Sequence, residues 1–297
     1  MRHQFAALRL ASLAVAIGVG LVRPSDLGAR ADATRIYLTV VDAKGKPVTG
    51  LTAADFEVRI DDTLQEVLGL ATAVEPASVL ILTDRLGLNS TYTAFDTGQA
   101  LKDFVKAIRT GSPDSKIALT TFDGTTMQVT KFTSPPAELD RALGRLGSMT
   151  SDAVLLDGLA DAARTMRGAP TDRRVILVLL AAYRSDQSGM QTDLVGEMLR
   201  LSQASIWALE VRQAQGGNVT NPTREQVLDA GAALSGGTRE LVASRSGVTA
   251  SLKRMADLIL SQYALTYGAT RGSSQSTLTV TVRRPDVKIL SPRWTTR

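Results

Sequence analysis

The chain has 297 residues, of which 44% are hydrophobic, 21% charged and 4% aromatic, and its formal net charge is +5. This composition excludes a disordered chain, because enough apolar side chains are present for a packed core. The length allows one or two domains, and the absence of cysteine excludes any disulfide.

The first predicted element is an export signal over residues 1–31. A short basic start precedes an apolar run from Leu10 to Val22, and an Ala-x-Ala cleavage pattern ends at Ala31. A retained membrane anchor is the alternative, but the run is shorter than the roughly 20 residues of a spanning helix. We therefore expect cleavage near Ala31 and a secreted or periplasmic mature chain without a membrane span.

Cleavage would change the charge and the chemistry of the mature chain. Removing four Arg and one Asp from 34 basic and 29 acidic residues leaves 30 and 28, a net charge of +2. Lys and Arg are not clustered, so we expect no nucleic-acid partner. The only histidine, His3, lies in the signal. The mature chain would therefore lack the residues for a Ser-His-Asp triad, a Cys-His pair or a usual zinc site.

Residues 32–75 are predicted to form a small β module. Apolar residues alternate with others over Arg35–Asp42 and over Asp55–Asp62, which is typical of half-buried strands. Gly45 and Pro47 break the chain between these two strands. Glu66–Ala71 is a third predicted strand.

Residues 76–262 alternate between buried strands and helices, which predicts a doubly wound, mostly parallel sheet. Continuous apolar runs predict strands covered on both faces, and helical spacing of apolar residues predicts the helices. The predicted strands are 78–83, 116–122, 127–132, 173–183, 205–211 and 238–242. The predicted helices are 92–109, one opening with Pro135, 153–167, 192–204, 223–235 and 247–263.

Residues 263–297 return to alternating strands without helices between them. The predicted strands are 263–269, 276–284 and 286–291. We expect them to pack with the N-terminal module. The predicted fold class is therefore α/β, with a doubly wound, mostly parallel sheet and a small β module formed by the N- and C-terminal strands.

Several stretches, in this order along the chain, resemble a von Willebrand factor A (VWA) domain, and specifically the exported acidobacterial VWFA-related family. The resemblance covers nearly the whole mature chain. It rests on "VVDAKGKPVTGLTAADFEVRIDD" in the first module and, in the α/β region, on "ASVLILTD", "KIALTTFDG", "VLLDGLADAAR", "RRVILVLL" and "GGTRELV". The resemblance implies a VWA fold and a role in protein binding.

The resemblance also implies a metal-ion-dependent adhesion site for Mg²⁺ or Mn²⁺, with five side-chain oxygen donors after the strands. Asp84 takes the first donor position, and aligning Asp157 with the family's helix aspartate fixes the threonine position. The other four positions fall on residues without a side-chain oxygen, namely Leu86, Leu88, Ala153 and Ala182. One carboxylate does not offset the reluctance of Mg²⁺ to lose water. We therefore expect no cofactor and a degenerate site.

The predicted function is a non-catalytic protein-interaction or scaffolding module. A strand-end carboxylate such as Asp84 can also bond to its own loop, and Leu86 and Leu88 are expected to fill the space of the metal shell. The candidate partner-binding residues lie in the loops after the strands, namely Asp84, Asn89, Ser90, Asp152, Tyr183 and Asp186.

Two other functions stay open. The first is a metal-dependent adhesion module with a rearranged Mg²⁺ or Mn²⁺ site, to which Ser151 and the same loop residues would contribute. The second is a carboxylate-based enzyme, although no pattern places a base beside a nucleophile. The sequence names neither a partner protein nor an oligomeric state.

Overall fold

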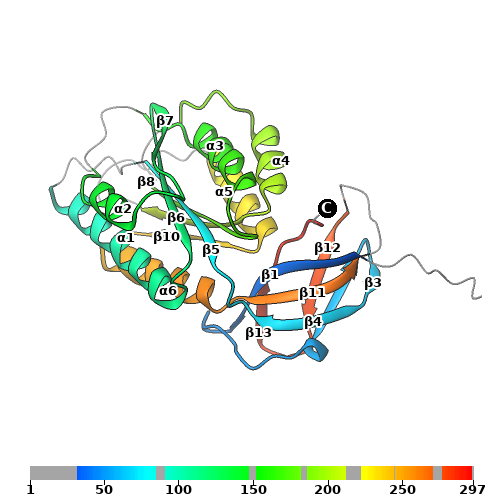
Figure 1. Cartoon of the computed structure of the whole chain (residues 1–297). Coiled ribbons are helices and arrows are strands. Elements are labelled where there is room, and N and C mark those ends of the chain that lie inside the picture. Colours follow the sequence, from blue (N-terminus) through cyan, green and yellow to red (C-terminus); the bar gives the residue numbers. More distant parts are fainter. Residues whose placement is uncertain are drawn as a thin grey trace, which may run out of the picture. The chain divides into compact units, whose positions relative to one another are not determined.

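The computed structural model describes residues 32–84, 91–146, 152–181, 186–211, 222–243, 245–269 and 276–295. By its internal contacts the chain divides after Arg30. The description below concerns the unit Ala31–Arg297, which contains an α/β region and a β module (Figure 1).

The α/β region is built on a six-stranded sheet with the order β10-β9-β8-β5-β6-β7. The first five strands in this order pair in parallel, and only β7 runs antiparallel to its neighbour β6. The strands are β5 (Ala77–Thr83), β6 (Lys116–Asp123), β7 (Thr125–Thr130), β8 (Arg173–Ala181), β9 (Ser205–Val211) and β10 (Thr238–Val242). This arrangement confirms the predicted doubly wound sheet.

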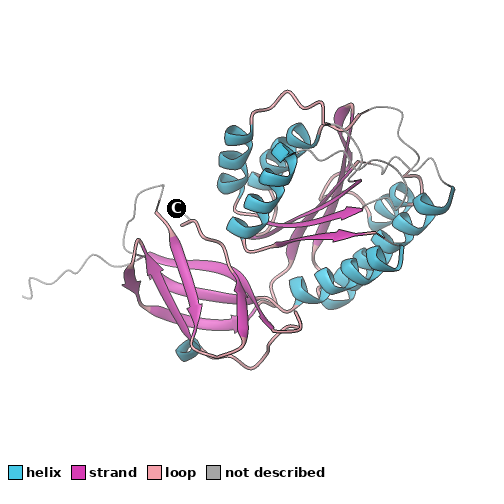
Figure 2. Cartoon of the chain, turned by 180° about the vertical axis from the view of Figure 1, so that it is seen from behind, coloured by secondary structure: helices cyan, strands magenta, loops and turns pink. Residues whose placement is uncertain are grey.

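Helices cover both faces of this sheet (Figure 2). Their bounds are α1 (Thr91–Gly111), α2 (Pro136–Leu143), α3 (Leu155–Arg167), α4 (Thr192–Ser202), α5 (Pro222–Ser235) and α6 (Arg245–Leu260). Helices α1, α2 and α6 contribute to one core, and α3, α4 and α5 to another. Among the described residues, no helix has the length and apolar character to cross a membrane.

Strand β5 shows why its central residues, Val79–Leu82, are all apolar. Val79 and Ile81 face one core, whereas Leu80 and Leu82 face the other. All four side chains are fully buried. A strand covered on both faces needs apolar residues at every position, in contrast to a strand with one wet face.

The β module joins strands from the two ends of the described chain. One sheet has the order β13-β1-β11-β4 and the other β12-β2-β3, and the two share a third core. The strands are β1 (Asp32–Asp42), β2 (Phe56–Ile60), β3 (Thr63–Gln65), β4 (Val67–Thr72), β11 (Tyr263–Ala269), β12 (Leu278–Val282) and β13 (Val287–Leu290), with a short 3₁₀ helix η1 (Ala53–Asp55) before β2. The fold class is therefore confirmed, including the contribution of both ends.

Several predicted element ends were wrong for local reasons. The strand predicted over Asp55–Asp62 ends at Ile60, because Asp61 and Asp62 have positive φ angles of 45° and 65° and turn the chain into β3. Such angles suit the tight turn of a two-residue hairpin. The hairpin between β6 and β7 turns at Gly124 alone, at φ 60°. Helix α3 begins at Leu155, two residues after the predicted start at Ala153.

Arg173, the first residue of β8, ties together the two chain crossings that link the module to the α/β region. Its side chain is 2% exposed. The guanidinium donates to the carbonyls of Ala73 (3.0 Å) and Glu75 (3.1 Å) in the crossing before β5. It also donates to Gln262 Oε1 (3.0 Å) and to the Ile259 carbonyl at the crossing after α6. Burial lowers the pKa of Arg173, and its hydrogen bonds all go to neutral oxygens.

Candidate functional site

The candidate site lies at the carboxyl ends of the parallel strands. Thr83 at the end of β5 is in register with Thr121 of β6 and Leu179 of β8, so the ends of these three strands meet at one edge of the sheet. Ligands of open α/β sheets bind outside this edge. The residues that follow each strand therefore decide what the face can bind.

Asp84 follows β5 and is buried. Its side chain has 0% exposure, and its backbone N–H donates to the Leu179 carbonyl at 3.4 Å. The preceding Thr83 is also buried, and its hydroxyl has no hydrogen-bond partner among the described residues. The Asp84 side chain therefore lies inside this edge of the sheet and not on its surface.

Ala153 lies between the end of β6 and the segment after β8. It forms an antiparallel bridge with Asp123 and a parallel bridge with Asp186, and its side chain is 2% exposed. The Gly124 N–H donates to the Asp152 carbonyl at 2.8 Å, and the Gln187 N–H donates to the Ala153 carbonyl at 2.8 Å. Backbone pairing, rather than side-chain ligands, thus holds these loops together.

A second set of contacts fixes the segment after β8 to the start of α3. Ser188 Oγ accepts from the backbone N–H of Leu156 at 2.9 Å, and so satisfies one of the free amides of the first helical turn. In return, Asp157 accepts from the N–H groups of Gly189 (3.2 Å) and Met190 (2.9 Å). Asp186 Oδ1 accepts from the Ser188 N–H at 2.9 Å. Asp157 is therefore a loop-holding residue and not only part of a solvated helix face.

The predicted site residues fall into two groups. Asp84, Asp152, Ala153 and Asp186 are described and lie at the same sheet edge. The other predicted positions lie outside the described residues, namely Leu86, Leu88, Asn89, Ser90, Ser151, Ala182 and Tyr183.

Sequence reasoning missed Asp123 and Ser188 as members of the site. Asp123 carries the same signal as Asp84, an acid at the carboxyl end of a buried strand, and could have been found. Ser188 carries no such signal, because its partner Leu156 lies 32 positions away along the chain.

Of the five donor positions that the resemblance implies for Mg²⁺ or Mn²⁺, the structure describes two, Asp84 and Ala153. Ala153 offers no oxygen at the position where the resemblance places a threonine. No cluster of three or more Asp, Glu, His or Cys side chains in the described part of the chain could hold a metal ion. Asp186 Oδ2 is buried without a hydrogen-bond partner there, but a single free carboxylate oxygen does not make a site for a hard divalent cation.

A buried charge network lies near the same edge, at the end of β9. Glu210 is 1% exposed and pairs with Arg224 of α5 at 3.0 Å and with Arg239 of β10. Arg239 also pairs with the exposed Asp229 at 2.9 Å. A buried carboxylate needs such partners, because an unpaired charge in the interior is costly. The network connects β9, α5 and β10 and leaves Glu210 committed to structural contacts.

No protein-family model matches the chain, and no curated protein matches it. Among solved structures, proximal thread matrix protein 1 from the mussel byssus, with a zinc-occupied MIDAS (metal-ion-dependent adhesion site) motif, matches with a TM-score of 0.52. The identity is 16%, and the match covers 68% of this chain and 50% of that protein, so this chain spans about half its length.

Two further structures are similar at lower scores. A von Willebrand factor type A protein from Catenulispora acidiphila matches at TM-score 0.48 and 14% identity, over 88% of this chain and 75% of its own. The pilus adhesin SpaC from Lactobacillus rhamnosus GG matches at TM-score 0.47 and 11% identity, over 82% and 43%. At such identities the likeness concerns the fold alone.

Proposed function

We propose that this chain, whose α/β region has a von Willebrand factor A fold, is an exported, non-catalytic protein-interaction module. Its partner would contact the loops at the carboxyl ends of β5, β6 and β8. We propose that this contact does not use a metal-bridged carboxylate. Export would follow cleavage near Ala31, as the N-terminal sequence predicts.

One observation carries the metal-free part of this proposal. Ala153, at the predicted threonine position, is held by backbone bridges between Asp123 and Asp186. Its side chain is buried, and the resemblance implies a donor oxygen at this position. A site that has lost its donors can keep its loops in place through backbone pairing, which leaves a preformed surface for a partner.

The non-catalytic part rests on the chemistry of the same edge. The acids described here serve structural contacts: Asp157 holds backbone amides, and Glu210 holds two guanidinium groups. The sequence predicts no His or Cys in the mature chain to act as a base or nucleophile beside them.

The metal-dependent alternative has one observation in its favour, the buried and unpartnered Oδ2 of Asp186. It would need further oxygen donors from Asp84, Asp123 or the neighbouring loops. A test of the proposed function must therefore separate a metal-free contact from a metal-bridged one.

The test is affinity capture from the envelope fraction and medium of the source cells, with and without EDTA. We compare the wild-type protein with Asp152→Arg on the candidate face. The matched control is Asp114→Arg, an equally exposed acid in the turn before β6, at the opposite end of the sheet. We expect a partner that binds the wild type and the control at least tenfold better than Asp152→Arg, with or without EDTA.

Two outcomes would contradict this expectation. Loss of the partner in EDTA, with recovery in Mg²⁺ or Mn²⁺, would support the metal-dependent alternative. Equal capture by all three proteins would place the contact elsewhere on the chain.

A further inference from the structure

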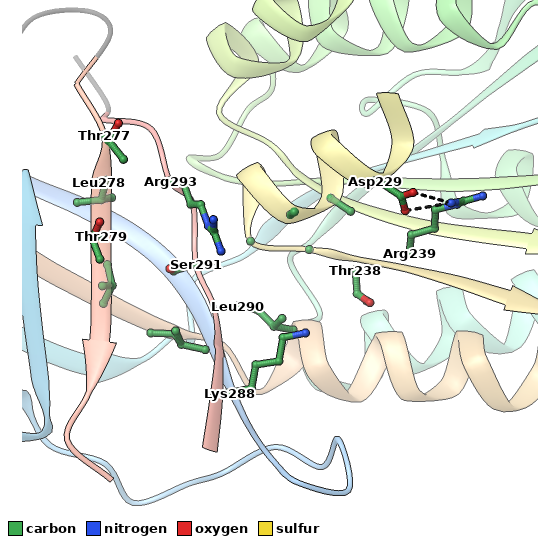
Figure 3. Close-up of a pocket in the computed structure, with 16 residues that line it drawn as sticks. Asp229, Thr238, Arg239, Thr277, Leu278, Thr279, Lys288, Leu290, Ser291 and Arg293 are labelled. Atoms are coloured by element: carbon green, nitrogen blue, oxygen red, sulfur yellow. Dashed lines mark hydrogen bonds and ion pairs between the residues drawn. The ribbon is translucent and has the colours of Figure 1, made fainter. Parts of the chain in front are cut away.

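A groove of about 630 Å³ lies at the amino end of β10 (Figure 3). It is lined by three segments that are distant in sequence: residues 229–239 of α5 and β10, residues 277–280 of β12, and residues 288–293. None of the contacts proposed above uses this groove.

Each strand that lines the groove is the last strand of its sheet. Strand β10 ends the six-stranded sheet, β13 ends the four-stranded sheet and β12 ends the three-stranded sheet. An edge strand presents a row of backbone N–H and C=O groups that an added strand can pair with. Proteins that recognise extended peptides often bind them in this way.

One end of the groove is closed by tightly packed backbone. Gly236 has a φ of 79°, and a Cβ on it would lie 2.7 Å from the carbonyl carbon of Ser291. The Arg293 N–H donates to the Leu234 carbonyl at 2.8 Å, and the Leu278 N–H donates to the Arg293 carbonyl at 2.9 Å. These bonds hold the backbone of the segment after β13 in place, and with it the position from which Arg293 extends.

The groove carries uncompensated positive charge. Lys288 and Arg293 extend into it from the same segment (Figure 3), and neither has an ion-pair partner among the described residues. Asp229, the acid among the lining residues, is already paired with Arg239. In a fully extended chain Lys288 and Arg293 would stand at most roughly 16 Å apart, at about 3.3 Å per residue.

We propose that this groove binds an extended acidic peptide segment of a partner protein. The segment adds as a strand along the free edge of β13, and its carboxylates pair with Lys288 and Arg293. Backbone pairing supplies the binding mode and the two cations select for acids. The inference is independent of the proposed function, since none of the partner-binding loop residues named above lines the groove.

The test uses a fluorescein-labelled peptide, acetyl-TEVEVEVT-amide, titrated with the purified protein in a fluorescence anisotropy assay. Its acids alternate with valines, so that they share one face of a strand. Two matched peptides accompany it: one with Gln in place of each Glu, and one that is N-methylated at every residue, so that neither edge can donate backbone hydrogen bonds.

The protein variant is Lys288→Glu with Arg293→Glu. Its control is Lys131→Glu with Arg167→Glu, which reverses two exposed charges outside the groove. We expect saturable binding to the wild type and to the control within twofold of each other. Binding should be at least tenfold weaker for the groove variant and for the Gln peptide, and absent for the N-methylated peptide. Circular dichroism shows that each variant is folded.

Three results would overturn the proposal. The first is no saturable binding to the wild type at millimolar protein. The second is equal binding by the groove variant and the wild type, and the third is full binding of the N-methylated peptide. Dimerisation of the wild type that is lost in the groove variant, measured by light scattering, would instead assign the groove to a second copy of the chain.

Discussion

The two ends of the parallel sheet treat their buried polar groups differently. At the amino end, the Ser78 hydroxyl bonds to Thr171 Oγ1 at 2.8 Å and accepts from the Thr171 N–H. There, too, the Arg173 guanidinium reaches four oxygens across two chain crossings. At the carboxyl end, the buried Thr83 Oγ1 and Asp186 Oδ2 have no hydrogen-bond partner among the described residues.

The proposed partner face lies at the end of β5 whose buried Thr83 hydroxyl has no partner among the described residues. Buried polar groups almost always find partners, so an exception needs a reason. The contrast concerns the hydroxyls of β5, since Glu75 Oε2 at the amino end is also buried without a hydrogen-bond partner in the described part of the chain. Substitutions at the two ends of the sheet test this comparison.

Substitution of Arg173 should have the largest effect. Arg173→Met keeps much of the side-chain volume but leaves four buried oxygens without their donor. Each unsatisfied buried acceptor costs about 1–3 kcal/mol, and partial relaxation reduces the sum. We expect the free energy of unfolding to fall by about 3–5 kcal/mol in urea denaturation.

The neighbouring Arg174 gives the matched control. It is only partly buried and donates to the carbonyls of Ser202 (3.1 Å) and Thr171 (3.4 Å). Arg174→Met should cost less, about 1–2 kcal/mol, since it leaves two acceptors without their donor instead of four. Equal losses for the two variants would show that the crossings do not depend on Arg173.

A smaller effect is expected from a matched pair on β5 itself. Ser78 and Thr83 lie at the two ends of this strand and are 0% and 1% exposed. Ser78→Ala removes a used hydroxyl and leaves Thr171 unsatisfied, which should cost about 1–2 kcal/mol. Thr83→Val replaces an unpartnered hydroxyl by a methyl group, so it should be neutral or stabilise by up to about 1 kcal/mol.

Thermal and urea unfolding of both variants measure this pair. Stability changes of opposite sign for the two variants would confirm that the buried hydroxyls at the two ends of β5 contribute differently to stability. A loss for Thr83→Val as large as that for Ser78→Ala would remove the comparison, because Thr83 would then have a partner that matters for stability.

The fold could be predicted because the hydrophobic periodicity of most strands and helices is visible in the sequence. Strand β5 has four consecutive apolar residues, Val79–Leu82, because both of its faces are covered, whereas β2 alternates because one of its faces is less buried. The short strand β3 was not predicted. Its start depends on two aspartates, Asp61 and Asp62, at positive φ, and a polar pair of this kind also suits a longer loop.

The candidate site was predictable only in part. Asp84 and Asp123 can be read from the strands that they follow. The contacts that hold the loops join Ser188 to Leu156 and Asp157 to Met190, and no local pattern brings such distant positions together. The edge strands that line the groove also depend on strand order, which follows from the whole fold and not from any one segment.

The smallest effect is expected at Tyr267, which tests whether an unpartnered hydroxyl marks a functional end at all. Tyr267 lies in β11 of the β module, is 0% exposed, and its hydroxyl has no partner among the described residues. Tyr263 in the same strand is the matched control, because its hydroxyl donates to the Val48 carbonyl at 3.0 Å. Tyr263→Phe should cost about 1 kcal/mol, and Tyr267→Phe should change stability at neutral pH by less than that.

The pH dependence identifies the Tyr267 hydroxyl directly. Burial raises its pKa from 10.0 to about 12. Because the folded pKa is the higher one, the contribution of the neutral phenol to stability is complete below pH 10 and is lost as pH rises towards 12. The free energy of unfolding of the wild type should therefore fall more steeply over this range than that of Tyr267→Phe. Equal slopes for the wild type and Tyr267→Phe would mean that solvent reaches the phenol, so that Tyr267 would no longer count as a buried hydroxyl without a partner.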